Sequence, residues 1–206
     1  MNTEKIIQII SQISRRMEQE KEFLTDLDNA IADGDHGINM ARGFSAADKK
    51  LSEFASNDIG AVLKSTGMTL VSAIAGSAGP LYGTAFMRSG MVMNGKIEMN
   101  ISDFIDCLKA SVEGVMQRGK SVRGEKTMLD AMIPSLEAMK KAFSDGLSDK
   151  EIINCGVDAA RKGVEFTKTI AATKGRASYI GERSIGHQDP GATSFTFMLE
   201  VIAENI

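Results

Sequence analysis

The sequence has 206 residues, 43% of them hydrophobic and 25% charged, which fits one globular domain with a sizeable core and excludes a disordered chain. The net charge of −3 argues against nucleic acid as a partner, because no basic surface is available to neutralise a phosphate backbone. No segment has the roughly 20 apolar residues of a membrane span, and residues 1–22 lack the apolar stretch of a signal peptide. Because the two cysteines, Cys107 and Cys155, have no CxxC spacing, we expect free thiols in a cytoplasmic protein.

Apolar residues at steps of three and four predict amphipathic helices along most of the chain. The first helix is expected over residues 6–31, where only Glu20 interrupts the apolar face. Two further helices are expected over residues 59–74 and 104–115, and Ser102 is the predicted N-terminal cap of the second of these.

The second half of the chain continues the helical pattern. Residues 129–143 predict a helix kinked at Pro134, where a backbone donor is missing. Residues 153–171 predict another helix behind a Ser148 cap. A last helix is expected to start at Asp189–Pro190, because an aspartate cap directly precedes a proline at the first helical position.

Glycine-rich joints separate these helices, and function is expected on such loops. They cover residues 34–37, 76–83, 119–124 and 175–191. The only strand-like alternation, KIEMNI at residues 96–101, is short, and we interpret it as a loop. The chain has no internal repeat and no linker, so the sequence predicts a single all-α domain over residues 1–206.

Three aspartates fall close together in the stretch DNAIADGDHGINM, residues 28–40. At about 5 Å and an effective dielectric constant of about 20, each pair of carboxylates would repel by roughly 3 kcal/mol. On a continuous helix Asp28 and Asp35 would share a face and Asp33 would point about 140° away from Asp28, because each residue turns by about 100°. Convergence of all three side chains therefore requires the helix to end near Ala32.

Gly34 and Gly37 allow the backbone to turn at this point. Converged carboxylates form a hard-oxygen site that suits Mg²⁺ or Ca²⁺ better than zinc. An EF-hand loop that started at Asp33 would need a carboxylate at its twelfth position, which is Phe44, so this alternative fails. The remaining alternative is that the aspartates are caps and solvated turn residues.

A second glycine-rich stretch, AGSAGPLYGTAF at residues 75–86, comes after an apolar helix. Such a loop exposes backbone N–H groups to an anion at the start of the next helix. Because Mg²⁺ binds through carboxylates together with nucleotide phosphates, the two stretches predict a magnesium–nucleotide site. Close packing of helices explains these glycines equally well.

The stretch GVMQRGKS, residues 114–121, matches the phosphate-binding pattern G-x-x-x-x-G-K-[ST] of P-loop NTPases. A P-loop lies after a buried strand and opens a helix, whereas a helical pattern precedes this stretch and Gly124 interrupts any helix after it. We interpret the match as chance, with a helix that ends at Gly119.

Two further stretches identify a family. GEKTMLDAM at residues 124–132 and GRASYIGERSIGHQDPGATS at residues 175–194, together with DNAIADGDHG and GSAGPLYGT, closely resemble the nucleotide-binding L subunits of bacterial dihydroxyacetone kinases. The resemblance covers essentially the whole chain, with four separated motifs in order. It implies a barrel of about eight antiparallel amphipathic helices with the nucleotide in a pocket at one end.

The resemblance also implies which residues form the site. Asp28, Asp33 and Asp35 would hold two Mg²⁺ ions. The residues that would contact the nucleotide are His36, Gly37, Ile38, Asn39, Ser77, Ala78, Gly119, Thr127, Met128, Arg176, Asp189, Pro190 and Gly191. The alternatives are that Arg176 forms a surface salt bridge and that Gly119 only ends a helix. No residue of the chain is assigned as an acid–base catalyst.

The activity that the resemblance implies is half of a phosphoryl transfer. The subunit would retain ADP, which a phosphohistidine protein of the sugar phosphotransferase system phosphorylates in place to ATP. The phosphoryl group would then pass to dihydroxyacetone on a partner kinase subunit, which gives dihydroxyacetone phosphate in glycerol metabolism. The resemblance leaves open whether the chain forms a homodimer.

Three other functions remain as alternatives: an ATP-exchanging kinase subunit, a P-loop-type NTPase that uses Gly114–Ser121, and a regulatory module that binds a transcription factor. A P-loop enzyme would lose nucleotide binding on Lys120→Ala and keep it on Asp33→Ala. The magnesium–nucleotide site predicts the reverse.

Overall fold

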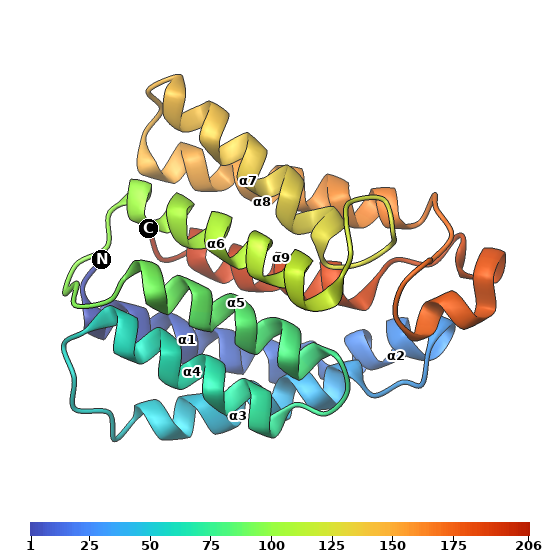
Figure 1. The fold of residues 1–206 in the computed structure, drawn as a ribbon, viewed down its shortest axis with the longest axis horizontal. Coiled ribbons are helices and arrows are strands. Elements are labelled where there is room, and N and C mark those ends of the chain that lie inside the picture. Colours follow the sequence, from blue (N-terminus) through green and yellow to red (C-terminus); the bar gives the residue numbers. More distant parts are fainter. The chain divides into compact units, whose positions relative to one another are not determined.

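Helices carry all the regular structure of residues 1–206, which the computed structural model describes in full (Figure 1). There are nine α-helices and one 3₁₀ helix, and a single isolated β-bridge joins Asn2 and Glu98. The predicted all-α fold class is therefore confirmed, and KIEMNI forms no strand. No helix combines the length and the continuous hydrophobicity that a membrane-spanning segment needs.

The chain forms two compact units. The first unit contains residues 1–18 and 39–120, and the second contains residues 19–38 and 121–206. The single domain over residues 1–206 stays a prediction.

The first unit is built from five helices, although the last residue of α1 and the first three of α3 belong to the second unit. These helices are α1 (Thr3–Gln19), α3 (His36–Leu51), α4 (Ile59–Ala73), α5 (Ala78–Val92) and α6 (Ile101–Gly119). Their apolar faces form a core that contains Ile6, Ile10, Leu51, Ile59, Val62, Leu63, Met93, Met99 and Cys107. The predicted helix over residues 59–74 corresponds to α4.

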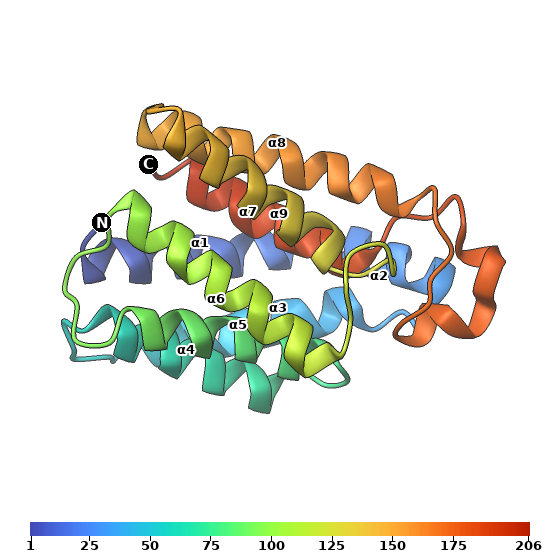
Figure 2. The same ribbon diagram turned by 45° about the horizontal axis from the view of Figure 1, so that its top comes forward.

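Glycines bring α4 and α5 unusually close, and the two helices lie side by side in both ribbon views (Figures 1 and 2). A Cβ atom on Gly67 would lie 2.7 Å from the carbonyl oxygen of Gly83, and one on Gly60 would lie 2.7 Å from that of Gly90. Gly60 precedes Gly67 in α4, whereas its partner Gly90 follows Gly83 in α5, so the two helices are antiparallel. Gly83 therefore serves helix packing, one of the two explanations that the sequence left open for residues 75–86.

The second unit contains α2 (Lys21–Ile31), α7 (Leu129–Ser144), α8 (Asp149–Thr167), the 3₁₀ helix η1 (Arg176–Ser184) and α9 (Pro190–Ala203). Figures 1 and 2 show α7 and α8 side by side, and α9 packs against α7, α8 and α2. The predicted caps are confirmed for α8, where Ser148 forms a capping box with Glu151, and for α9, where Asp189 precedes Pro190. Both caps fix where these helices begin.

Two predicted helix boundaries are wrong in the first part of the chain. The helix expected over residues 6–31 is broken at Glu20, where the apolar face is interrupted and the backbone (φ −93°, ψ 8°) leaves the helical range. The cap of α6 is Asn100 rather than Ser102, because Asn100 and Asp103 bond reciprocally to each other's backbone amides.

Two further corrections concern the second unit. Helix α8 ends at Thr167 rather than at residue 171, because groups outside the helix bind both the carbonyl and the hydroxyl of Thr167. The joint over residues 175–191 is not only a loop, since it contains η1. Helix α7 continues through Pro134, which confirms the helix predicted over residues 129–143, while the kink at Pro134 stays a prediction.

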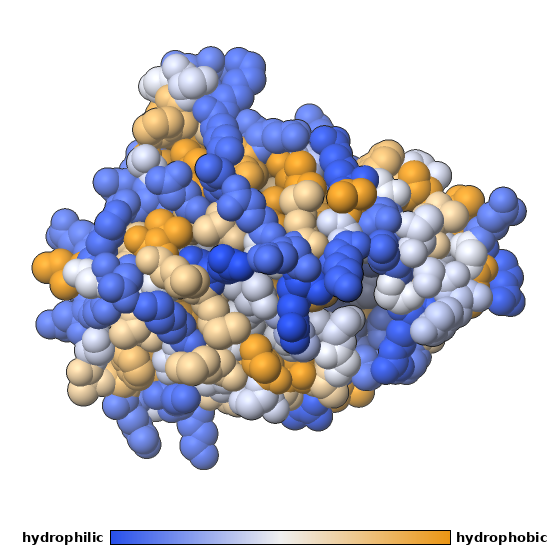
Figure 3. All heavy atoms as spheres, in the orientation of Figure 1, coloured by the Kyte–Doolittle hydropathy of each residue, from blue (hydrophilic) through white to orange (hydrophobic).

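The face of the molecule in Figure 3 is mostly hydrophilic, and its hydrophobic residues form small separate groups. Among the exposed large hydrophobic side chains are Met68, Met91 and Ile97 of the first unit and Phe143, Phe166 and Tyr179 of the second. The polar turns are therefore the natural place to seek a site.

Candidate functional site

The turn between α2 and α3 brings the three predicted aspartates together. Helix α2 ends at Ile31, where the amide of Ala32 donates to the carbonyl of Asp28 (2.6 Å). Gly34 then takes a left-handed conformation (φ +70°), which a residue with a side chain adopts at a cost of about 1 kcal/mol or more. The predicted helix end near Ala32 and the role of Gly34 in the turn are confirmed.

The carboxylate of Asp28 holds the returning chain in place. Its Oδ2 accepts hydrogen bonds from the backbone amides of Asp35 (2.9 Å) and His36 (3.2 Å), at the start of α3. These bonds satisfy N–H groups that have no partner inside the helix. Asp28 is therefore a buried structural anchor that still has a second oxygen, Oδ1, for another ligand.

Asp28, Asp33 and Asp35 each contribute one carboxylate oxygen to a group whose members lie within 4.8 Å of one another. Asp28 is buried, Asp35 is half-buried and Asp33 is exposed. Three carboxylates at this distance repel one another unless a positive charge lies among them. The cluster thus has the carboxylate oxygens that a hard divalent cation prefers as ligands.

The spacing can be compared with the bond lengths of the candidate ions. Oxygens that surround one Mg²⁺ at about 2.0–2.1 Å lie at most about 4.2 Å apart. The 4.8 Å separation in the cluster fits one Ca²⁺, two Mg²⁺ ions, or one Mg²⁺ after a small rotation of an exposed side chain. Asp33 is the exposed member of the cluster.

Arg176 forms an ion pair with Asp33. Arg176 is the first residue of η1, and its side chain is more than half exposed. The structure therefore brings this predicted nucleotide residue next to the acidic cluster, and the salt bridge considered as an alternative is present. A guanidinium beside the cluster can also bind two oxygens of a phosphate.

His36 lies in the interior of the second unit. Its ring Nε2 is 2.9 Å from the hydroxyl oxygen of Ser194 in α9, and burial lowers its pKa to about 4. The imidazole is therefore neutral near pH 7, so it can bridge the start of α3 and α9 without adding charge to the carboxylates next to it.

Gly37 and Ile38 have contrasting surroundings. A Cβ on Gly37 would lie 2.5 Å from the Thr25 hydroxyl and 2.7 Å from the Thr25 backbone nitrogen, so only glycine allows α3 to start this close to α2. Ile38 is exposed. Contact of either residue with a nucleotide stays a prediction.

The N-terminus of α9 contains the predicted turn Asp189–Pro190–Gly191. The carboxylate of Asp189 accepts from the backbone amide of Ala192 (2.7 Å), and burial raises the pKa of this carboxyl to about 7. A Cβ on Gly191 would lie 3.5 Å from Cβ of Met128, so the structure brings together two predicted residues that are far apart in the sequence. Thr127, next to Met128, donates its backbone amide to Asp130 (2.8 Å).

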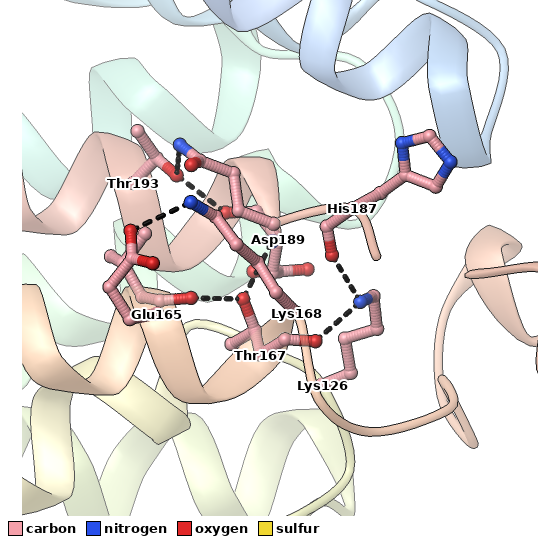
Figure 4. A network of polar contacts seen from close by, with 9 residues as sticks. Lys126, Glu165, Thr167, Lys168, His187, Asp189 and Thr193 are labelled. Carbon is pink, nitrogen blue, oxygen red and sulfur yellow. Dashed lines mark hydrogen bonds and ion pairs between the residues drawn. The ribbon is translucent and has the colours of Figure 1, made fainter. Parts of the chain in front are cut away.

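A buried polar network beside this turn was not anticipated from the sequence, and Figure 4 shows part of it. The ammonium group of Lys126 donates to the carbonyl oxygens of Thr167 (2.5 Å) and His187, while the His187 ring points away from the network. Asp130 is also fully buried and accepts from the backbone amides of Gly124 and Thr127. Lys126 belongs to the motif GEKTMLDAM, but no local pattern distinguishes it from a surface lysine.

The other predicted residues belong to the first unit. Asn39 accepts from the guanidinium of Arg42 (2.6 Å), which also donates to the carbonyl of Ala73 at the end of α4 (2.8 Å). The sequence did not indicate that Arg42 would bond Asn39 and the end of α4. Ser77 precedes the first residue of α5, Ala78, without a side-chain capping bond.

The P-loop-like stretch is helical over most of its length. Residues 114–119 complete α6, which ends at Gly119 as predicted. Lys120 comes next in a left-handed conformation (φ +48°) as the C-terminal cap. A P-loop opens a helix after a strand, so this stretch has the wrong surroundings for phosphate binding.

Comparisons with known proteins identify the family. The model of the DAK2 domain matches residues 30–204. The chain is 44% identical over 184 residues to the PEP-dependent dihydroxyacetone kinase, ADP-binding subunit DhaL, of Escherichia coli (strain K12), covering 89% of this chain and 88% of that one. It is 36% identical over 198 residues to the PTS-dependent dihydroxyacetone kinase, ADP-binding subunit DhaL, of Lactococcus lactis subsp. lactis, covering 96% and 95%. The chain belongs to the DAK2 domain family, and the resemblance stated from its four motifs is confirmed.

A solved structure supports the fold. The crystal structure of the dihydroxyacetone kinase from C. freundii in complex with AMP-PNP and Mg²⁺ matches 97% of this chain with a TM-score of 0.75 and 21% sequence identity. The chain spans only 33% of that longer protein. At this identity the likeness establishes the helical fold alone.

Proposed function

We propose that this chain is the ADP-binding subunit of a cytoplasmic dihydroxyacetone kinase and that it binds ADP together with magnesium. Relatives that are 36–44% identical over nearly their whole length have names that describe such a subunit. The observation that carries the proposal is the group of three carboxylates within 4.8 Å, whose mutual repulsion a bound divalent cation would offset.

The residues of the second unit would have distinct roles in binding. Asp28, Asp33 and Asp35 would hold two Mg²⁺ ions, and Asp28 would keep the geometry because its other contacts are backbone amides. Arg176 would bind phosphate oxygens, since its guanidinium already lies beside Asp33. The turn at Asp189–Gly191 with Thr127 and Met128 would border the nucleotide.

The proposed activity is a relay of one phosphoryl group. A phosphohistidine protein of the phosphotransferase system would donate it to ADP, and the terminal phosphoryl group of the resulting ATP would pass to a hydroxyl of dihydroxyacetone on the partner subunit, which regenerates ADP. Bound Mg²⁺ would offset the negative charge of the phosphates. The role of this chain is then to bind, to orient and to neutralise charge, and no general base is required of it.

Calorimetric titration with ADP and Mg²⁺ tests the proposal against the P-loop alternative. We expect Asp33→Ala to abolish measurable binding and Lys120→Ala to bind as the wild-type chain does, because Lys120 only caps α6. Asp26→Ala, an exposed aspartate on the same helix as Asp28, is the matched control. Loss of binding in Lys120→Ala with retention in Asp33→Ala would overturn the proposal.

The identity of the phosphoryl donor needs a separate experiment. Reconstitution with a dihydroxyacetone-binding subunit should turn over with a phosphorylated phosphotransferase protein and stall with free ATP. A binding free energy beyond about −12 kcal/mol would make exchange of the nucleotide too slow for turnover. Sustained turnover on ATP alone at an equal rate would identify an ordinary ATP-exchanging kinase subunit.

A further inference from the structure

Lys126 is the most unusual buried residue outside the proposed metal site. Its side chain is only 1% exposed, and its backbone has a left-handed conformation (φ +59°) that residues with side chains rarely adopt. Strained backbone of this kind persists only where the surrounding structure holds it, and such strain is concentrated at functional sites.

The ammonium group of Lys126 is bound by backbone carbonyls. Its Nζ donates to the carbonyls of Thr167 (2.5 Å), Ile170 (3.4 Å) and His187. Burial lowers the pKa of Lys126, and the nearby carboxylates of Asp189 and Asp130 act in the opposite direction. An ammonium group has three donors and no acceptor, so these three carbonyls use its full capacity.

The carbonyls bound by Lys126 come from the two ends of one segment. Thr167 is the last residue of α8, and His187 lies two residues before the cap of α9, so the ammonium group closes residues 168–187 at their base (Figure 4). A backbone bond from the Gly186 amide to the Lys168 carbonyl (2.8 Å) supports the same closure. Lys126 itself lies outside the segment, just before α7.

This closed segment carries a residue of the candidate site. It contains η1, whose first residue is Arg176, the partner of Asp33. Ala172, Ala177 and Ile180 of the segment pack on Ile31 at the end of α2, which is a small apolar contact. Other contacts also hold the segment, such as the bond from the Thr173 amide to the Glu125 carbonyl (3.3 Å), and closure at the base adds to them in holding Arg176 next to the carboxylates.

We propose that Lys126 is a positioning residue, whose ammonium group closes residues 168–187 and thereby fixes Arg176 beside Asp33. The expected effect of Lys126 on nucleotide binding rests on the proposed function. The expected effect of Lys126 on the closure of residues 168–187 does not.

Limited proteolysis of the full chain tests the proposal directly. Trypsin can cut the segment after Lys168, Lys174, Arg176 and Arg183, and cleavage is scored at the last three of these sites, which every variant retains. In Lys126→Met, which keeps an unbranched side chain without the charge, we expect cleavage at these sites to be faster by about tenfold or more, with unchanged far-UV circular dichroism. Lys168→Met is the matched control, because Lys168 lies in the same segment, is half-buried, and its ammonium group pairs with Glu165 (2.7 Å) rather than with backbone carbonyls.

Tyrosine fluorescence gives a signature that a general loss of stability would not produce. The chain has no tryptophan and two tyrosines, of which Tyr179 is 86% exposed on η1 and Tyr82 is buried. In a Tyr82→Phe background, Lys126→Met should lower the fluorescence anisotropy of Tyr179, and Lys168→Met should leave it unchanged. Lys126→Arg, which retains a cation with several donors, should restore part of the anisotropy.

Three outcomes would overturn the proposal. They are equal cleavage of Lys126→Met and Lys168→Met, cleavage of Lys126→Met throughout the chain with loss of the helical signal, and an anisotropy of Tyr179 that does not change. ADP and Mg²⁺ binding is measured in the same variants. If the segment loosens while the wild-type chain binds no nucleotide, the proposed function fails and the role of Lys126 stands. If wild-type and Lys126→Met bind equally, Lys126 does not position the site.

Discussion

The two units of the chain bury different kinds of polar group. The first unit buries only hydroxyl and amide side chains: Thr3, Ser14, Asn39, Ser65, Thr66, Thr69 and Ser111. The second unit buries carboxylates, an imidazole and an ammonium group: Asp28, His36, Lys126, Asp130 and Asp189. Burying a charge is unfavourable unless the charged group is paired and hydrogen-bonded. Buried charged groups are therefore concentrated at functional sites.

Glycines at close helix contacts and buried charged side chains should respond differently to substitution. Close helix packing at glycines occurs in both units, for example at Gly67 and Gly83 in the first and at Gly163 in the second, whereas buried charged groups held by backbone amides and carbonyls occur only in the second. Substitutions at the packing glycines should change the free energy of unfolding alone, and substitutions of the buried charged groups should also change metal or proton binding.

The largest expected effect is on packing. In Gly67→Ala the new Cβ would lie 2.7 Å from the backbone oxygen of Gly83, so the helices α4 and α5 must separate. We expect a loss of about 3 kcal/mol in the free energy of unfolding, measured by urea denaturation. Gly114→Ala on α6 is the control, because its two nearest neighbours are side-chain carbons of Arg88 and Thr84 rather than the backbone of another helix. Equal stability of the two variants would contradict the packing account.

The next largest expected effect is the stabilisation of the folded chain by bound Mg²⁺. At a hundredfold excess over its dissociation constant, Mg²⁺ should stabilise the wild-type chain by about 2.7 kcal/mol, or roughly 5–10 °C in melting temperature. EDTA should remove this gain, because the carboxylates of Asp28, Asp33 and Asp35 then repel one another. Asp33→Asn should lose the Mg²⁺-dependent shift and keep its helical circular dichroism, whereas Asp26→Asn should keep both. A full shift in Asp33→Asn would count against the cluster as the metal site.

A smaller effect depends on pH through Asp189. Burial raises the pKa of this carboxyl from 3.8 to about 7 in the folded chain, so the folded state binds more protons between these values. The contribution of Asp189 to stability is therefore fully present below pH 4 and is lost as pH rises through 7. His36 has the opposite effect between about pH 4 and 6.5, because burial lowers its pKa.

The difference between wild-type and Asp189→Asn isolates the Asp189 contribution, since asparagine can still cap α9. In EDTA, the stability of the variant relative to the wild type should rise by about 2 kcal/mol between pH 5.0 and 6.5. A pH-independent difference in urea midpoints would show that Asp189 ionises normally.

The smallest effect is expected at a helix end that lies in the second unit but outside the buried network. Ser148→Ala removes the hydroxyl that caps α8 and bonds Glu151, and it should reduce stability by about 1 kcal/mol. The Mg²⁺-dependent shift in melting temperature should be unchanged. A smaller Mg²⁺-dependent shift in Ser148→Ala would show that metal binding depends on helix ends outside the buried polar network, which would contradict the account.

The acidic cluster could be predicted because it is local. Asp28, Asp33 and Asp35 lie within eight residues of chain, and the glycine at position 34 indicates where the helix must end. The caps of α8 and α9 were predictable for the same reason, since the capping side chain and the amide that it binds are three residues apart.

Lys126 could not be predicted because its partners are distant. The three carbonyls that it binds are 41, 44 and 61 residues further along the chain, and no backbone carbonyl is distinguishable in a sequence. The role of Gly83 was ambiguous for another reason. A glycine whose backbone amide binds an anion and a glycine that lets a neighbouring helix pack closely look the same in a sequence. Only the position of Gly67 opposite Gly83 resolves the ambiguity.

The most direct test of the central claim, that Asp28, Asp33 and Asp35 hold magnesium with ADP, is native mass spectrometry of the purified full-length chain. The account predicts that the wild-type chain retains ADP together with Mg²⁺, that EDTA releases both, and that Asp33→Asn retains neither. A wild-type chain without ADP and magnesium, or an Asp33→Asn chain that retains both at full occupancy, would contradict it.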